Sequence, residues 1–274
     1  MSHIFFHITA GLYLVATVVF TVYLFTHRAA IVKTARAVLL AGLATHVATI
    51  LLRWHEGGRF PTTTLHEVLT LSACIIVAAY GVFLYKYKLE VLGAFVAPFA
   101  LVMTIAASLL PSEIVPLAPV LESYWLPIHV ILAILGNVFF ALTCVFGIMY
   151  LIQERYLKAR KLKGLFFLLP SLDMLDDLSY RCLTYGFPLL TLAMITGAIW
   201  SEYSFGSYWM WKHRQVWSLI MWGLYAGLLH GRITSGWRGR KSAKYSIWAF
   251  VLLVVTSTII YVLVGEGHGL IIER

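Results

Sequence analysis

Charged residues are scarce in this chain of 274 residues, because Asp, Glu, Lys and Arg together make up only 12%. A water-soluble domain carries roughly 25% charged residues, so the composition argues against a soluble fold. Hydrophobic residues make up 61% and gather in long runs. A run of about 20 apolar residues is long enough to cross the hydrocarbon core as a helix. We therefore predict a membrane protein that lies in the lipid bilayer.

Cysteine is also rare, and the chain has no long basic stretch that is free of apolar runs. The three cysteines, Cys74, Cys144 and Cys182, lie in apolar stretches and form no Cys-x-x-Cys pair. We therefore expect neither a thiol-disulfide exchange centre nor a zinc site. The net charge of +9 does not predict nucleic-acid binding without a basic segment, and we expect no nucleic-acid partner.

The apolar runs predict an all-α, polytopic bundle of about eight transmembrane helices, forming a single domain over residues 1–274. They lie near residues 5–26, 35–54, 66–85, 89–110, 127–152, 180–200, 215–235 and 244–265. Sixteen of the 21 Lys and Arg residues fall on one side of this bundle. Cytoplasmic loops carry the excess of Lys and Arg, so we predict that both termini lie outside the cytoplasm.

Two connecting segments differ from the rest. Residues 154–179 hold a basic run, a short apolar run and then Ser171 followed by three acids, which predicts a helix start. We expect this segment to lie along the inner interface, with a disordered loop as the alternative. Residues 200–217 are predicted to form an outer aromatic loop in which Gly206 permits a turn. Its aromatic residues are Trp200, Tyr203, Phe205, Tyr208, Trp209, Trp211 and Trp217.

Aromatic residues at a membrane boundary commonly belong to the interfacial belt, and that interpretation applies to any one of these rings. Their density exceeds what anchoring needs, and a continuous aromatic surface suits a flat, apolar ring system such as haem or a quinone.

Two histidines, His46 and His230, lie away from the ends of predicted spans, where an unpartnered ionisable group is costly and metal ligation by a neutral imidazole removes that cost. His46 shares a helix face with Gly42, and His230 shares one with Gly223 and Gly227, so small residues leave room for a macrocycle. The alternative is that the glycines serve helix packing and each histidine bonds to a neighbour.

Two further histidines are predicted on the outer side with the aromatic segment. His129 begins the fifth span and His268 follows the eighth. Haem iron is commonly held by axial histidines, so two inner and two outer histidines suggest two haem positions. The candidates for the haem propionates are the outer cations Arg53, Arg59, Lys212 and Arg214.

Three stretches resemble the haem-handling membrane proteins of cytochrome c assembly, the CcsA, ResC and CcmC group, which carry a tryptophan-rich (WWD) outer loop. They are GAIWSEYSFGSYWMWKHRQVWSLIMWGLYAGLLHGR (197–232), LLRWHEGGRFPTTTLHEVL (51–69) and LESYWLPIHVILAILG (121–136). The resemblance implies that His129 and His268 are the outer haem ligands and that His46 and His230 are the transmembrane pair. It also implies a haem platform that includes Gly206, Trp209, Trp211 and Trp217.

The chain departs from the family pattern in the aromatic segment. The family usually reads Trp-Asp-Pro-Lys-Glu-Thr-Trp over residues 211–217, whereas this chain has Lys212-His213-Arg214-Gln215-Val216 between its two tryptophans. The usual His-Ser-Tyr is here His268-Gly269-Leu270. The basic residues, with the stretch 236–241, are closer to the HemX branch, which is linked with control of haem synthesis.

The leading hypothesis is a haem b-binding protein of a bacterial-type cytoplasmic membrane that presents haem at its outer face for cytochrome c assembly. Its expected partners are an apocytochrome c and a ResB-like membrane protein. No side chain has to act as acid or nucleophile, so we expect at most a component of a cytochrome c haem ligase. The alternatives are a HemX-type regulator that binds a haem-synthesis enzyme at its inner face, and a quinone-linked b-type cytochrome.

Overall fold

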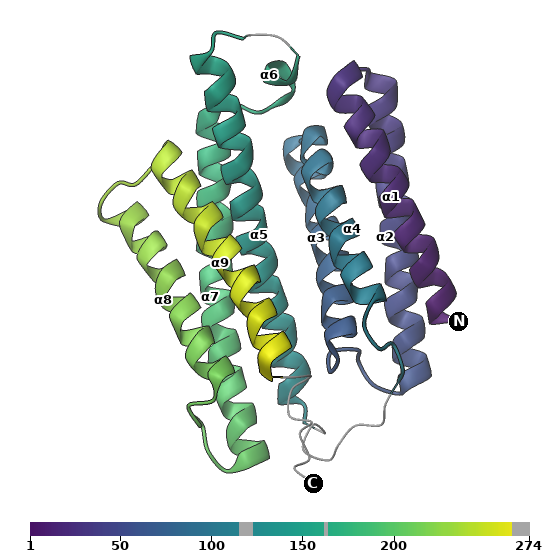
Figure 1. The fold of residues 1–274 in the computed structure, drawn as a ribbon, viewed down its shortest axis with the longest axis vertical. Helices are drawn as coiled ribbons and strands as arrows, with labels where there is room; N and C mark the ends of the chain where they lie inside the picture. The colour runs from purple at the N-terminus through teal and green to yellow at the C-terminus, as the bar shows by residue number, and fades with distance from the viewer. Residues whose placement is uncertain (115–122, 162–163, 265–274) are drawn as a thin grey trace. The chain divides into compact units, whose positions relative to one another are not determined.

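A computed structural model describes residues 1–114, 123–161 and 164–264, which are helical apart from short connections (Figure 1). No β-strand occurs in these ranges. The helices are α1 (Ser2–Thr26), α2 (Ala29–Gly57), α3 (Leu65–Tyr87), η1 (Glu90–Leu92), α4 (Gly93–Ser108), α5 (Trp125–Lys158), α6 (Leu165–Leu168), α7 (Leu172–Phe205), α8 (His213–Ile233) and α9 (Gly239–Val264).

Seven of the described helical segments are long and apolar enough to cross a membrane: α1, α2, α3, η1 with α4, α5, α7 and α9. The eighth predicted span is also a helix, α8, which has 21 residues but is less apolar. The expected all-helical membrane bundle is therefore confirmed, with helices that extend beyond most of the predicted apolar runs. The orientation of the termini stays a prediction.

The local sequence signals at both ends of α7 have the expected structural effect. The Ser171 hydroxyl accepts a hydrogen bond from the Met174 N–H at 3.3 Å and so caps the helix N-terminus. At the other end Gly206 adopts φ 69°, a left-handed conformation that glycine tolerates, and its N–H bonds the Glu202 carbonyl. The aromatic segment therefore differs from a loop over 200–217, because only residues 206–212 lie between two helices.

Residues 154–179 contain the end of α5, the single turn α6 and the first two turns of α7. The three acids Asp173, Asp176 and Asp177 consequently lie on a helix that continues into a membrane span. Their position at its N-terminus is favourable because the helix dipole is positive there. The interfacial placement of this segment stays a prediction.

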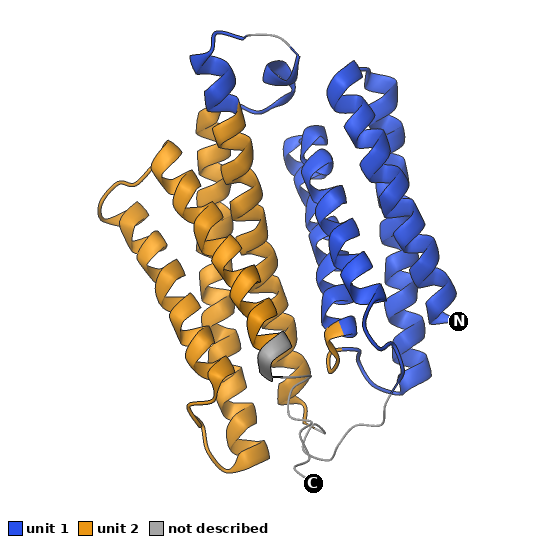
Figure 2. Ribbon diagram, viewed as in Figure 1, with its two compact units in different colours: residues 1–61, 66–116, 153–170 blue, residues 62–65, 117–152, 171–274 orange. Residues whose placement is uncertain are grey.

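The chain packs as two compact units, and the single domain over 1–274 stays a prediction (Figure 2). Unit 1 contains residues 1–61, 66–116 and 153–170. In unit 1 a two-residue turn joins α1 to α2, and α1 also packs on α4. Its fully buried side chains include Tyr13, Phe20, Tyr80 and Leu92.

Unit 2 contains residues 62–65, 117–152 and 171–274. In this unit α7, α8 and α9 pack together, and a Cβ on Gly136 of α5 would lie 3.1 Å from the Leu190 nitrogen of α7. That close approach shows why a small residue stands there. The stacked rings of Phe140 and Tyr225, with centroids 3.5 Å apart, bring α8 onto α5.

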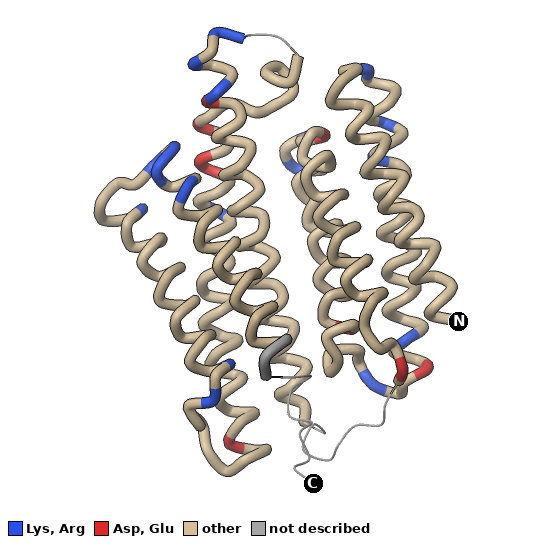
Figure 3. The backbone as a smooth tube through the Cα atoms, in the orientation of Figure 1, with Lys and Arg blue, Asp and Glu red and all other residues tan. Residues whose placement is uncertain are grey.

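Charged residues lie near the helix ends in both units and leave the middles of the helices apolar (Figure 3). This distribution agrees with helices that cross a bilayer, because a charge at mid-membrane is costly.

Candidate functional site

His46 lies in the middle of α2 and is completely buried within unit 1. Its Nδ1 lies 3.0 Å from the hydroxyl of Tyr13 on α1, whereas its Nε2 is buried and has no hydrogen-bond partner. Gly42, Thr49 and Arg53 are buried on the same side of α2, as their spacing predicted. An imidazole whose second nitrogen is buried without a partner has the chemistry of a metal ligand.

The space beside His46 is occupied, which corrects the expectation that Gly42 leaves room for a macrocycle. A Cβ on Gly42 would lie 2.7 Å from the Tyr13 ring. The missing side chain therefore makes room for that ring. The sequence could not reveal this because Tyr13 stands on another helix.

Arg53, a predicted propionate partner, is only 4% exposed and already pairs with a carboxylate of the chain. Its Nε donates to Glu67 Oε1 at 3.0 Å and its Nη1 donates to the Ser112 carbonyl at 2.9 Å. Arg59 donates to the other Glu67 oxygen at 3.1 Å. A propionate would have to compete with Glu67 for both guanidinium groups, so their role as propionate partners stays a prediction.

His129 lies in the first turns of α5 and contacts α7 within unit 2. Its Nδ1 is 2.7 Å from the Ala193 carbonyl oxygen. A carbonyl can only accept, so Nδ1 carries the proton, and a neutral ring then has its lone pair on Nε2. A Cβ on Gly197 would lie 2.7 Å from Nδ1, so that glycine provides the space for the ring.

His230, near the end of α8, is exposed. Gly223 and Gly227 have nothing within 4 Å of where their Cβ atoms would be, so the predicted face of small residues is open. His46 belongs to unit 1 and His230 to unit 2, and each is described within its own unit. His268 lies outside the described residues.

The aromatic segment is held at both ends by hydrogen bonds. The Ser201 hydroxyl donates to the Ser207 carbonyl at 2.7 Å, and the Met210 N–H donates to Gln215 Oε1 at 2.9 Å. Gln215 thus accepts a backbone N–H at the start of α8, as an acidic side chain at this position could also do, but it carries no charge.

Trp200 is buried at 8% exposure, whereas the other rings of this segment are only partly covered. Trp209 and Trp211 meet edge to face with centroids 5.8 Å apart, and Trp211 is 71% exposed. Tyr208 is exposed, and the Trp217 indole N–H donates to Ser257 Oγ at 3.4 Å. Lys212 Nζ lies 4.7 Å from the centre of the Phe205 ring. Arg214 is half-buried at the start of α8. Exposed aromatic rings next to a cation suit a flat ligand that carries carboxylates.

Two buried polar residues were not anticipated from the sequence. His66, at the start of α3, is 5% exposed, and its Nδ1 lies 2.8 Å from the Ala107 carbonyl oxygen. Glu67, beside it, is 2% exposed. In the sequence, Arg53, Arg59 and Glu67 lie close together on either side of a short loop. This proximity of one acid to two bases was the available signal for a buried ion-pair cluster.

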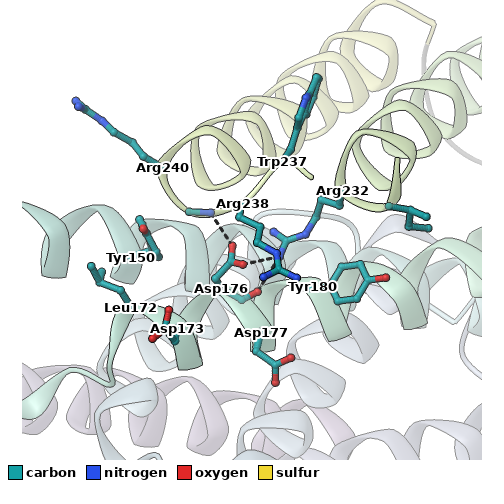
Figure 4. A pocket seen from close by; sticks show the side chains of 12 residues that line it. Tyr150, Leu172, Asp173, Asp176, Asp177, Tyr180, Arg232, Trp237, Arg238 and Arg240 are labelled. Carbon is teal, nitrogen blue, oxygen red and sulfur yellow. Dashed lines mark hydrogen bonds and ion pairs between the residues drawn. The ribbon is translucent and has the colours of Figure 1, made fainter. Parts of the chain in front are cut away.

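Unit 2 has a pocket of about 790 Å³, lined by charged, aromatic and aliphatic residues, at the turn between α8 and α9 (Figure 4). At its centre Asp176 accepts from Arg232 at 2.9 Å and from the Gly239 N–H at 3.0 Å. Arg232 also lies 5.0 Å from the centre of the Tyr180 ring. This network fastens α7, α8 and α9 to one another at their predicted cytoplasmic ends.

Comparison with known proteins decides the family. A family model described as "Cytochrome C assembly protein" matches residues 62–266. The chain belongs to the cytochrome c assembly protein family. The matched range contains His129, His230 and the aromatic segment, whereas α1, α2 and His268 lie outside it.

Among individual family members, "Cytochrome c biogenesis protein CcsA" of Guillardia theta is 34% identical over 232 residues, covering 77% of each chain. The CcsA protein of Chlamydomonas reinhardtii is 35% identical over 229 residues, covering 81% of this chain and 63% of that protein. The chain thus spans less than two thirds of the length of this second relative.

A solved structure, "Cytochrome c Heme Lyase CcmF", matches with a TM-score of 0.69 over 92% of this chain and 46% of that chain. At 14% sequence identity this match shows a shared membrane fold.

Proposed function

We propose that this protein binds haem in the membrane and presents it at the aromatic segment 200–217 for attachment to an apocytochrome c. Family membership supports a role in cytochrome c assembly, and the names of the relatives point to the same process. The proposal includes haem b as the bound form, a ResB-like partner, a bacterial-type cytoplasmic membrane and an outer position for the aromatic segment.

The observation that carries the haem part is the environment of His46. A fully buried imidazole nitrogen without a partner is costly in a membrane interior, and iron ligation removes the cost. The surroundings of His129 and His230 support the same group: the Ala193 carbonyl orients the His129 ring through Nδ1, and Gly223 and Gly227 leave open space on the helix that carries His230. We propose His46, His129, His230 and His268 as the haem ligands.

The other residues of the proposed site would contact the haem and orient it. Gly206 turns the chain so that Tyr208, Trp209, Trp211 and Trp217 form an apolar platform. Lys212, Arg214 and Arg53 are the proposed propionate partners. When bound, haem supplies the iron and the vinyl groups, while the protein supplies ligation, orientation and exclusion of water.

The optical spectrum of the purified protein tests this function. After expression with ample haem, the wild type should show the absorbance of ligated haem, and each replacement His46→Ala, His129→Ala, His230→Ala and His268→Ala should reduce or shift it. The exposed His27, at the turn between α1 and α2, gives the control, because His27→Ala should leave the spectrum unchanged. A colourless wild type would overturn the proposal.

A second prediction concerns the position of the His129 ring. The replacement Gly197→Ala places a methyl group 2.7 Å from Nδ1, so the ring must move and its bond to Ala193 must lengthen. Supporting contacts of metal-ligating histidines are worth about 10- to 100-fold in affinity, and we expect a loss of that size in a haem titration. Gly11→Ala, on α1 with open space around it, should bind as the wild type does. Equal affinity in the two variants would contradict the assignment of His129.

A HemX-type regulator is the second candidate, favoured by Lys212 and Gln215, which stand where the family usually has acids. A deletion strain separates the two functions. Loss of c-type cytochromes supports haem presentation, whereas normal c-type cytochromes with altered haem precursors support regulation.

A further inference from the structure

The contact between α1 and α2 is unusually polar for two apolar helices. Along this interface the Thr9 and Thr45 hydroxyls lie 2.8 Å apart, and the Tyr13 hydroxyl lies 3.0 Å from His46 Nδ1. Both Tyr13 and His46 are completely buried, so no water can take the place of either group. The pair is therefore a fixed element of unit 1.

The partner of His46 differs in kind from the partners of His66 and His129. His66 and His129 each meet a backbone carbonyl, which only accepts and so fixes one tautomer. A phenol hydroxyl can donate or accept. The Tyr13 contact can consequently persist whether Nδ1 or Nε2 of His46 carries the proton.

Space as well as hydrogen bonding sets the position of Tyr13. Its ring fills the gap that Gly42 leaves between the two helices, where a Cβ would come within 2.7 Å of the ring. The ring is thus held against the helix turn that precedes His46. The ring fixes the place of the hydroxyl, and the hydroxyl fixes the orientation of the imidazole.

The way in which histidine ligates iron connects the Tyr13 contact at Nδ1 with the unpartnered Nε2 of His46. An imidazole that binds iron through Nε2 keeps its proton on Nδ1, and such ligands nearly always donate that second N–H to a fixed acceptor. The Tyr13 hydroxyl is the group at hydrogen-bond distance from His46 Nδ1. Nε2, which has no partner in the protein, is then the ligating atom.

From this geometry we infer that Tyr13 is the positioning residue of His46: its hydroxyl accepts the Nδ1 proton and presents Nε2 to haem iron. The inference rests on the proposed function. It gives α1, which lies outside the range matched by the family model, a direct part in the transmembrane haem site.

Two substitutions on opposite helices test the inference in the full-length protein. Tyr13→Phe keeps the ring and removes only the hydroxyl, whereas Gly42→Ala keeps the hydroxyl and displaces the ring. For each variant, haem is titrated by absorbance, and the component that His46→Ala abolishes is analysed for its dissociation constant and midpoint potential. Gly11→Ala, on α1 with nothing near the added methyl group, is the matched control.

We expect both variants to weaken that component about 10- to 100-fold and Gly11→Ala to leave it unchanged. Tyr13→Phe should also raise the midpoint potential, because a hydrogen bond from Nδ1–H makes the imidazole a stronger donor and favours ferric iron. A purely space-filling Tyr13 predicts a different result, in which Tyr13→Phe behaves as the wild type and only Gly42→Ala is impaired. That result would overturn the inference and leave the proposed function intact, whereas a wild type that binds no haem would overturn both.

Discussion

Replacing Glu67 by glutamine should lower the free energy of unfolding by about 3–5 kcal/mol, the range found when one partner of a buried ion pair is removed. The Glu67 side chain is 1% exposed and is shared by Arg53 and Arg59, whose side chains are 4% and 14% exposed. Glu67→Gln keeps the shape of the side chain but leaves two guanidinium groups without their counter-charge. The measurement is the unfolded fraction of the purified protein in mixed micelles as the denaturing detergent is increased.

Glu90 provides the matched control for this change. It also pairs with an arginine in unit 1, Arg36 at 3.1 Å, but both side chains are more than a third exposed. Exposed pairs contribute about 0–1 kcal/mol, so Glu90→Gln should be close to the wild type. If Glu67→Gln were equally mild, the buried cluster would not stabilise this end of unit 1.

The second large effect is expected at Asp176. Arg232, whose side chain is 5% exposed, donates to this carboxylate, which also accepts the Gly239 N–H. Asp176→Asn removes the charge that balances Arg232 at the point where α7, α8 and α9 meet. We expect a loss of about 3 kcal/mol of unfolding free energy. The same unfolding assay measures it, and limited proteolysis should show faster cleavage at the α8–α9 turn.

The adjacent acid is a stringent control, because Asp177 also pairs with an arginine. Its contact with Arg181 is 2.7 Å long, but the two side chains are 53% and 51% exposed. Asp177→Asn should therefore change the unfolding free energy by less than about 1 kcal/mol. A loss as large as that of Asp176→Asn would show that the charge of the α7 N-terminus, and not burial of Arg232, determines stability.

The sequence was sufficient to predict the structural features that depend only on residues close together in the chain. All eight predicted spans are helices, because an apolar run of bilayer length is itself the signal. The helix start at Ser171 and the turn at Gly206 were predictable for the same reason, since each depends on one side chain and the residues next to it.

The contacts between helices could not be predicted in this way. Tyr13 with His46, and Arg53 with Glu67, join residues on different helices. Their pairing depends on how each helix is rotated about its axis. A soluble helix shows that rotation by its single apolar face, whereas a membrane helix is apolar on most sides and leaves it open. Gly42 was for this reason expected to leave room for a ligand, although the space holds a tyrosine ring.

The length of α7 has a consequence for access to the protein. Its 34 residues extend about 51 Å at 1.5 Å per residue, well beyond the roughly 30 Å of hydrocarbon in a bilayer. We therefore expect the acidic end of this helix, with Asp173, Asp176 and Asp177, to reach the aqueous phase together with the α8–α9 turn. A water-soluble reagent added to one side of a sealed vesicle can reach that turn without entering lipid, and its labelling reports directly which compartment the turn faces.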